Sequence, residues 1–301
     1  MTSASCCSGQ LCNQFTVPSV KCSTISRCWI ILPVLFYILL FLLNPLLKSS
    51  AQYSTKGLGQ ECKLNFIVAA DTFLFDRILY RLLPRAEIGT KQPAFPLRIL
   101  VAVVDFVAGI PYLLHFTLPF VYSAWLMVKK RESITFYQFL LAFGLTCSVG
   151  VLVQYALPTP PPWMIPPAKV ELSSSATPTF IPLPPEGNFC RIDRILGFAL
   201  FKKLYAQNSL VCGAFPSLHT AWPTVLLFTK PWIGRWFCWM HVGLIAFAAM
   251  WSLHHWVLDI VFGFGIGWIC CKASKALILA TFPQPAAEKS VTAAVAGTIE
   301  E

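Results

Sequence analysis

The sequence predicts an all-α fold: a polytopic membrane protein with about six transmembrane helices. Hydrophobic residues make up 56% of the 301-residue chain, and the mean hydropathy is +0.65. Charged residues make up only 12%, about half of the roughly 25% that is typical of soluble domains. The apolar residues gather in runs of about 20, the length that a helix needs to cross a bilayer core of about 30 Å.

Six apolar runs are long enough to span a membrane. The first contains Pro33, which a spanning helix tolerates when its neighbours satisfy the freed backbone groups. The last contains Gly263, Gly265 and Gly267, which favours close contact with another helix. The predicted spans are residues 29–47, 101–127, 136–157, 209–229, 233–252 and 255–280.

We therefore expect a membrane catalytic domain at 29–280 between cytosolic tails at 1–28 and 281–301. An even number of spans places both termini on one side, and the basic residues gathered there make it cytosolic by the positive-inside rule. Two long lumenal loops follow, at about 48–100 and 158–208.

The two lumenal loops differ in composition. In the first, residues 66–83 alternate apolar and charged groups. This pattern predicts an amphipathic helix on the membrane surface or a solvated helix packed on the protein. The second loop is rich in proline from 158 to 185, and such loops often serve as lids or binding loops.

The charge and the cysteines narrow the choice of partners. A net charge of +10 would suggest nucleic acid in a soluble protein. Here basic residues flank apolar runs, so we expect anionic lipid headgroups and no nucleic acid as partners.

The twelve cysteines show no CxxC pair or zinc-finger spacing. A disulfide among Cys62, Cys190 and Cys212 is compatible with their predicted lumenal side.

Two short stretches carry candidate chemistry, and both begin on the lumenal face. Gly213 to His219 opens the fourth span, and His254 to Asp259 opens the sixth. A spacing of four predicts that His255 and Asp259 share a helix face. A carboxylate bonded to one imidazole nitrogen leaves the other as an outward lone pair, an activated nucleophile suited to phosphorus. His219 could protonate the leaving oxygen as general acid and later deprotonate the acceptor.

Two other interpretations of these residues exist. A histidine near a helix end can be a plain interfacial residue, but Asp259 inside a span costs about 2.5–3.5 kcal/mol, which favours a function. A metal site would use His219, His254, His255 and Asp259. Because adjacent histidines point to different helix faces, His254 and His255 are not expected to bind one metal ion together. The transfer scheme requires no metal, and we expect no cofactor.

The motifs resemble a known family. Pro216-Ser217-Leu218-His219 resembles the Pro-Ser-x-His motif of the type 2 phosphatidic acid phosphatase (PAP2) superfamily, and His255-x-x-x-Asp259 resembles the end of its third motif. Within the superfamily, the fungal inositol phosphorylceramide synthase branch is closer. The shared features are Gly-Ala-Phe-Pro-Ser-Leu-His, the His-His-aromatic stretch, Pro161-Pro162-Trp163, Arg191-Ile192-Asp193, Asp105 and Pro111-Tyr112-x-x-His115. The resemblance runs from about residue 70 to 270 and implies a PAP2-like helical bundle.

The chain also departs from the superfamily. The first motif, a lysine followed by Arg-Pro, is absent, and Ala248-Ala249 replaces the Ser-Arg pair before the nucleophile. Both departures favour the synthase branch over simple phosphatases. Arg191 and Arg194 are the candidate phosphate ligands, as bidentate donors. The alternative is that these arginines pair with Asp193 or with lipid headgroups.

The remaining candidates bind substrate or support the fold. Ser217 and His254 lie within the two motifs and are candidate substrate ligands. Trp163 is either a wall of the headgroup site or an interfacial anchor. Intramembrane ionisable residues such as Asp105 and His115 are functional candidates by default. Their spacing of ten puts His115 about 80° away around a helix, and Asp105, near the lumenal end, could face the site. The alternative is that both residues form hydrogen bonds between helices.

The resemblance implies a lipid phosphotransferase that works through a phosphohistidine intermediate. Its substrates would be phospholipids and sphingolipids, with inositol phosphate passing from phosphatidylinositol to ceramide or a similar alcohol. It also implies a lumenal active site in the Golgi or another endomembrane. One alternative is a lipid or prenyl phosphate phosphatase, in which water replaces the alcohol. Another is a non-enzymatic transporter or lipid-binding scaffold, although a transporter of this size tends to show paired halves, and the sequence has no internal repeat.

Overall fold

The structure is a computed structural model that describes residues 31–36, 38–39, 66–75, 95–129, 134–164, 187–207, 212–229 and 234–281. Within these ranges the regular elements are all helical, which confirms the predicted class. The predicted N-terminal tail, most of the first span and of the first lumenal loop, and nearly all of the C-terminal tail lie outside them. So do Cys62 and residues 165–186 of the proline-rich loop.

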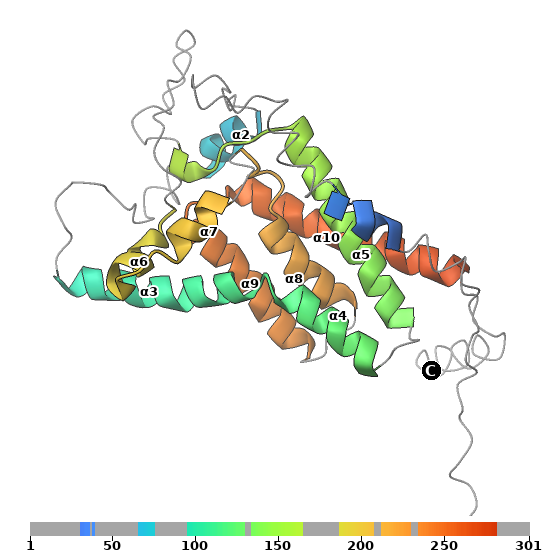
Figure 1. The fold of residues 1–301 in the computed structure, drawn as a ribbon. Helices are drawn as coiled ribbons and strands as arrows, with labels where there is room; N and C mark the ends of the chain where they lie inside the picture. The colour runs from blue at the N-terminus through green and yellow to red at the C-terminus, as the bar shows by residue number, and fades with distance from the viewer. Residues whose placement is uncertain are drawn as a thin grey trace, which may run out of the picture.

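Figure 1 shows how the helices are arranged. Three of them are long and apolar enough to cross a membrane, over Pro96–Leu114, Ile134–Ala156 and Val257–Ala280. The chain is a multi-pass membrane protein. The elements are α2 (Phe66–Phe75), α3 (Phe95–Leu114), α4 (Leu118–Lys129), α5 (Ile134–Ala156), the 3-10 turn η2 (Pro162–Met164), α6 (Cys190–Leu196), α7 (Phe201–Gln207), α8 (Leu218–Thr229), α9 (Arg235–Trp251) and α10 (Val257–Thr281).

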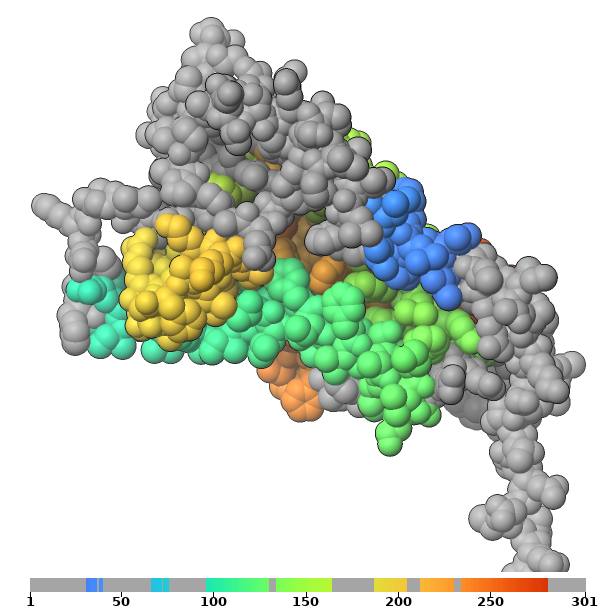
Figure 2. Space-filling model, viewed as in Figure 1, coloured from blue at the N-terminus to red at the C-terminus, as the bar shows by residue number. Residues whose placement is uncertain are grey.

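Helices α5, α8 and α10 pack against one another, with α9 against α8 and α3 against α9. One apolar cluster joins α4, α5, α8 and α10 through buried side chains such as Tyr122, Phe139 and Val225. A second joins α3, α6 and α9 through Tyr112, Ile192 and Ala248. Figure 2 shows α6 and α7, in yellow, lying over α3, in teal.

The glycines predicted to allow close helix contact do so at two of three positions. A Cβ at Gly263 would lie 2.2 Å from the Ser217 carbonyl oxygen, and one at Gly267 would lie 2.7 Å from that of Ala221. Gly265 has no such neighbour within 4 Å. Only residues without a side chain let α10 approach the start of α8 this closely.

The predicted span 101–127 is wrong as a single helix. It divides into α3 and α4, which are separated by residues 115–117. Pro119 has no backbone N–H to donate to the His115 carbonyl, and its ring would clash there, whereas proline is tolerated in the first turn of a new helix. The predicted span 209–229 is also shorter as a helix: α8 has 12 residues and begins after Pro216.

The described part of the first loop favours the packed alternative for its helix. In α2 the side chains of Ile67, Val68 and Asp71 are buried, and Val68 belongs to an apolar cluster with Ala214 and Trp256. The opposite side exposes apolar groups, with Phe73 84% exposed. Helix α2 therefore packs on the segment that carries the candidate site.

The predicted lumenal cysteines have different states. Cys212 is disulfide-bonded, whereas Cys190 is a buried thiol at the start of α6. Cys212 immediately precedes the first candidate motif, so this bond fixes the segment that enters it.

Candidate functional site

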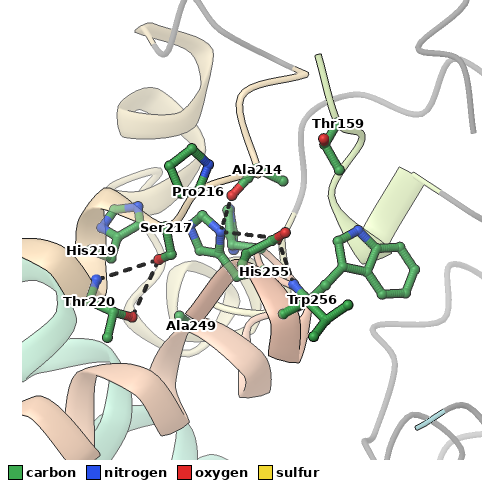
Figure 3. Close-up of polar contacts among 12 residues, drawn as sticks. Thr159, Ala214, Pro216, Ser217, His219, Thr220, Ala249, His255 and Trp256 are labelled. Atoms are coloured by element: carbon green, nitrogen blue, oxygen red, sulfur yellow. Dashed lines mark hydrogen bonds and ion pairs between the residues drawn. The ribbon is translucent and has the colours of Figure 1, made fainter. Parts of the chain in front are cut away.

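His255 lies in the turn before α10 and not within the helix as predicted. The helix begins at Val257 because the Asp259 carboxylate turns back and accepts the Trp256 backbone N–H at 2.8 Å, which satisfies a donor at the helix start. His255 and Asp259 therefore do not share a helix face. Their side chains still meet, with His255 Nδ1 3.5 Å from Asp259 Oδ2 (Figure 3).

The closest partner of His255 Nδ1 is a backbone carbonyl. The oxygen of Ala214 lies 2.8 Å away. Because a carbonyl only accepts, Nδ1 carries the hydrogen, and Nε2 of the neutral ring holds the lone pair. Ala214 is itself held, since its N–H donates to the Thr159 carbonyl at 3.1 Å. The sequence analysis predicted that the Asp259 carboxylate orients His255. In the structure the Ala214 carbonyl makes the closer contact with Nδ1, at 2.8 Å, and the carboxylate lies at 3.5 Å.

His219 stands on the first turn of α8 and faces His255. Their ring centroids are 5.1 Å apart, with the planes inclined at 69°, and Figure 3 shows the two rings side by side. The two motifs therefore converge, as the sequence predicts. Because the rings come from different segments, their separation depends on how the start of α8 packs on α10.

Ser217 links the two motifs through a backbone hydrogen bond, and its side chain caps the start of α8. Its N–H donates to the Asp259 carbonyl oxygen at 2.9 Å. Its hydroxyl accepts from the Thr220 N–H at 3.4 Å, the contact of an N-cap residue, as Figure 3 shows. In this structure the side chain is completely buried and serves the helix start.

Two separate segments hold the turn between α9 and α10. From the first, the Pro160 carbonyl accepts from the Trp256 indole at 2.7 Å, and the Trp163 N–H donates to the Leu253 carbonyl at 3.1 Å. From the second, Asn188 donates to the carbonyl of Trp251 through its side chain, at 2.7 Å, and to that of Ser252 through its N–H. The turn that carries His255 is therefore fixed on both sides.

Asp105 pairs with Arg191 and not with the histidines. Arg191 donates from Nε and Nη2 to the two carboxylate oxygens at 2.7 and 2.6 Å. The Trp251 indole adds a third hydrogen bond at 2.7 Å, and the guanidinium lies over its ring at 5.9 Å. The Arg191 guanidinium, which the sequence analysis assigned to phosphate, thus binds a carboxylate. Asp105 contacts this arginine and not the histidine pair, contrary to the interpretation that it faces the site.

The alternative of an Arg191–Asp193 pair is wrong. Asp193 is buried and accepts the backbone N–H groups of Phe201 and Lys202 at 2.9 and 2.8 Å. This links α6 to the start of α7. Arg194 lies exposed on α6, so its guanidinium is accessible from outside the protein.

The ring of His254 lies 6.1 Å from that of Tyr112 between centroids. Its Nδ1 contacts the Ser252 hydroxyl at 2.9 Å, and its ring lies against Gly187, where even a Cβ would not fit. Burial, and secondarily His255, lowers the pKa of His254 to about 3, so the ring is neutral at physiological pH. It therefore offers no positive charge to a phosphate.

Tyr112 and His115 are contacts of His219 that the sequence analysis did not expect. His219 Nε2 lies 2.8 Å from the Tyr112 hydroxyl, and Nδ1 lies 2.9 Å from His115 Nε2. The prediction counted the angle of His115 from Asp105 and paired neither residue with His219. The signal that could have found them is their spacing of three, which puts Tyr112 and His115 on one side of a helix.

The four residues considered as metal ligands do not form a cage. In the parts of the chain described here, no three His, Cys, Asp or Glu side chains come together so that they could hold a metal ion. His254 is directed toward Gly187, as given above, while His219 and His255 face each other. The arrangement offers two facing histidine rings, each hydrogen-bonded to other groups, and one carboxylate 3.5 Å from His255 Nδ1.

The chain is similar to several curated enzymes. It is 29% identical over 187 residues to the inositol phosphorylceramide synthase catalytic subunit of Schizosaccharomyces pombe, which covers 59% of this chain and 42% of that protein. It is 29% identical to inositol phosphorylceramide synthase of Candida albicans, over 54% and 34% of the two chains. It is 31% identical to phosphoinositol dihydroceramide synthase of Bacteroides thetaiotaomicron, over 56% and 55%.

The alignments thus span about a third to a half of the length of these relatives. No solved structure matches the chain. The PAP2 superfamily matches residues 100–273, a range that contains the facing pair His219 and His255 and also Asp259. This match covers more than half of the sequence and includes every contact of the pair described above. The chain therefore belongs to the PAP2 superfamily.

Proposed function

We propose that this chain is a membrane lipid phosphotransferase that carries a phosphoryl group on His255. The observation that carries the proposal is the facing pair His219 and His255, 5.1 Å apart between ring centroids. His255 Nδ1 is occupied by the Ala214 carbonyl, so Nε2 is the atom with a lone pair for phosphorus. The similarity to three phosphoinositol-type ceramide synthases supports this class of substrate.

In the first step His255 Nε2 attacks the phosphorus of phosphatidylinositol. The N–P bond forms and the bond from phosphorus to the diacylglycerol oxygen breaks. His219 donates its proton to that oxygen, so diacylglycerol leaves neutral. Asp259, 3.5 Å from Nδ1, stabilises the positive charge that develops on the ring.

In the second step the hydroxyl of ceramide, or of a similar lipid alcohol, takes the phosphoryl group. His219 removes its proton, the oxygen attacks phosphorus, and the N–P bond breaks to release His255. The product is an inositol phosphate ester of the lipid alcohol. We propose that this occurs on the lumenal face of the Golgi or another endomembrane, within a catalytic domain at 29–280. Arg194, which is exposed, remains our candidate for the incoming headgroup.

The test uses purified full-length protein in mixed micelles with labelled phosphatidylinositol and ceramide, and separately with phosphatidate. We expect ceramide-dependent labelled product from the wild type and none from His255→Ala. His219→Ala should be slower by about 10²–10⁴-fold, the contribution of a general acid. Acid-labile label on the protein, absent from His255→Ala, would reveal the intermediate.

Two results would contradict the proposal. Free phosphate from phosphatidate without ceramide-dependent product would select a phosphatase of the same family. Activity retained in His255→Ala would remove the nucleophile from the scheme.

A further inference from the structure

We infer that His115 and Tyr112 are positioning residues that set the tautomer of His219, so that its Nε2 is the atom that moves protons. The inference rests on the proposed function, in which His219 is the general acid and base. Its support is a chain of hydrogen bonds that begins at a backbone carbonyl and ends at the catalytic ring.

The first link fixes the hydrogen on His115. Its Nδ1 makes a short contact with the Tyr112 carbonyl oxygen. Because a carbonyl can only accept, Nδ1 carries the hydrogen, and Nε2 of the neutral ring is a lone pair. The geometry of one helix end, where α3 stops after Leu114, therefore determines which nitrogen of His115 can accept.

The second link passes this choice to His219. His219 Nδ1 lies 2.9 Å from His115 Nε2, and a lone pair there requires His219 Nδ1 to be the donor. The remaining nitrogen, Nε2, is then an acceptor in the neutral ring, 2.8 Å from the Tyr112 hydroxyl, which donates to it. Without these partners either nitrogen of His219 could carry the hydrogen.

Water has little access to the two residues in the part of the chain that the structure describes. His115 and Tyr112 are each only 1% exposed, so water does not replace a lost contact without rearrangement. Aromatic rings enclose His115, with Phe116 4.3 Å and Trp222 6.2 Å away between centroids. The titratable groups that face the two histidines are Tyr112, His241, His254 and His255.

The consequence for the reaction is a fixed route for the proton. The hydrogen on His219 Nδ1 stays on the bond to His115 through both steps. His219 enters the first step with a hydrogen on each nitrogen, and the Nε2 proton, taken up from solvent, goes to the departing diacylglycerol oxygen. In the neutral ring that follows, Tyr112 donates to the Nε2 lone pair until the acceptor alcohol arrives, whose proton then returns to Nε2.

The test compares three substitutions at one position. His115→Leu removes the acceptor and keeps an apolar side chain. His115→Gln places an amide oxygen near the original Nε2, whereas His115→Asn places its amide near Nδ1, too short to reach His219. We expect His115→Leu and His115→Asn to lower kcat by about 10–100-fold, as loss of an outer hydrogen-bond partner does at other histidine sites, with KM changed little. His115→Gln should recover most of the loss.

The pH profile distinguishes this role from a purely structural one. An acceptor at His219 Nδ1 stabilises the protonated ring, and a general acid is active only below its pKa. Loss of the acceptor in His115→Leu should therefore move the alkaline limb of kcat to lower pH, and His115→Gln should move it back. Tyr112→Phe, which loses a donor to the Nε2 lone pair of the neutral ring, should move the alkaline limb in the opposite direction, to higher pH, because the hydroxyl stabilises the unprotonated form of His219.

A measurement on the wild-type protein avoids dependence on any variant. Histidine ¹⁵N chemical shifts should show the Nδ1–H tautomer for both His115 and His219. An Nε2–H tautomer of His219 would overturn the inference, and so would wild-type kcat and pH profile in folded His115→Leu. Loss of activity in His219→Ala and His255→Ala alongside either result would leave the proposed function standing. Full activity in those two variants would instead reject the proposed function.

Discussion

Replacing Gly263 with alanine adds one methyl group where α10 crosses the segment that leads into α8. A Cβ there would lie 2.2 Å from the Ser217 carbonyl oxygen, and real Cβ contacts are essentially never closer than 3.0 Å. The neighbour is backbone and not the end of a flexible side chain, so α8 and α10 must separate. Restoring an ordinary contact requires a displacement of roughly 1 Å, and a misplacement of that size costs about 100-fold in rate.

The displacement acts directly on the site. Ser217 lies two residues before His219 and donates to the Asp259 carbonyl at 2.9 Å, so the separation moves one histidine away from the other. We expect Gly263→Ala to reduce kcat by about 100-fold in the mixed-micelle transfer assay while the protein remains folded. Thermal unfolding measured on the same preparation checks the fold.

Gly265→Ala is the matched control, because it lies in the same helix and a Cβ there would meet no described atom within 4 Å. It should keep the wild-type rate and gain up to about 1 kcal/mol of stability, since alanine is the better helix former. Wild-type kcat in Gly263→Ala would refute the argument that the approach of the two helices sets the distance between the histidines.

Three further predictions concern stability and metal dependence. Asp71→Ala removes the carboxylate that accepts the Leu258 N–H at 2.6 Å and should destabilise the protein by about 0.5–2 kcal/mol, as loss of a helix cap does; an unchanged melting temperature would contradict this. Arg191→Met leaves Asp105 buried without its ion-pair partner and should cost about 3–5 kcal/mol, measured by denaturant unfolding. Adding Asp105→Asn should recover much of that loss, and failure to recover would mean that the pair is not coupled. Activity should persist after dialysis against a chelator, because the transfer scheme uses histidine nitrogens and a carboxylate only; loss of activity restored by a divalent metal would oppose it.

The sequence predicted the helical class, the close contact at Gly263 and the meeting of two distant motifs. These depend on side-chain patterns that are visible in the chain itself, such as the apolar runs and the Pro-Ser-x-His stretch. It did not predict that the Ala214 carbonyl would orient His255, because every residue has a carbonyl and none marks its position. That contact depends on the backbone pairing of Thr159 with Cys212 and Ala214, which sets the direction of the Ala214 carbonyl.

The contacts of His219 were missed for a related reason. A periodic apolar pattern continues from α3 into α4, so hydropathy alone indicates one helix, and an angle counted around that helix separates His115 from the site. That angle was counted from Asp105, which pairs with Arg191 and not with the histidines, so it did not locate the site. Likewise, the choice of Arg191 between Asp193 and Asp105 depends on long-range packing of α6 on α3, not on neighbours in sequence.

The segments on either side of residues 165–186 are each attached to the turn between α9 and α10 by their own hydrogen bonds, through Trp163 on one side and Asn188 on the other. The turn that carries His255 is thus held at two points by two separate segments, so the loss of one attachment leaves the other in place.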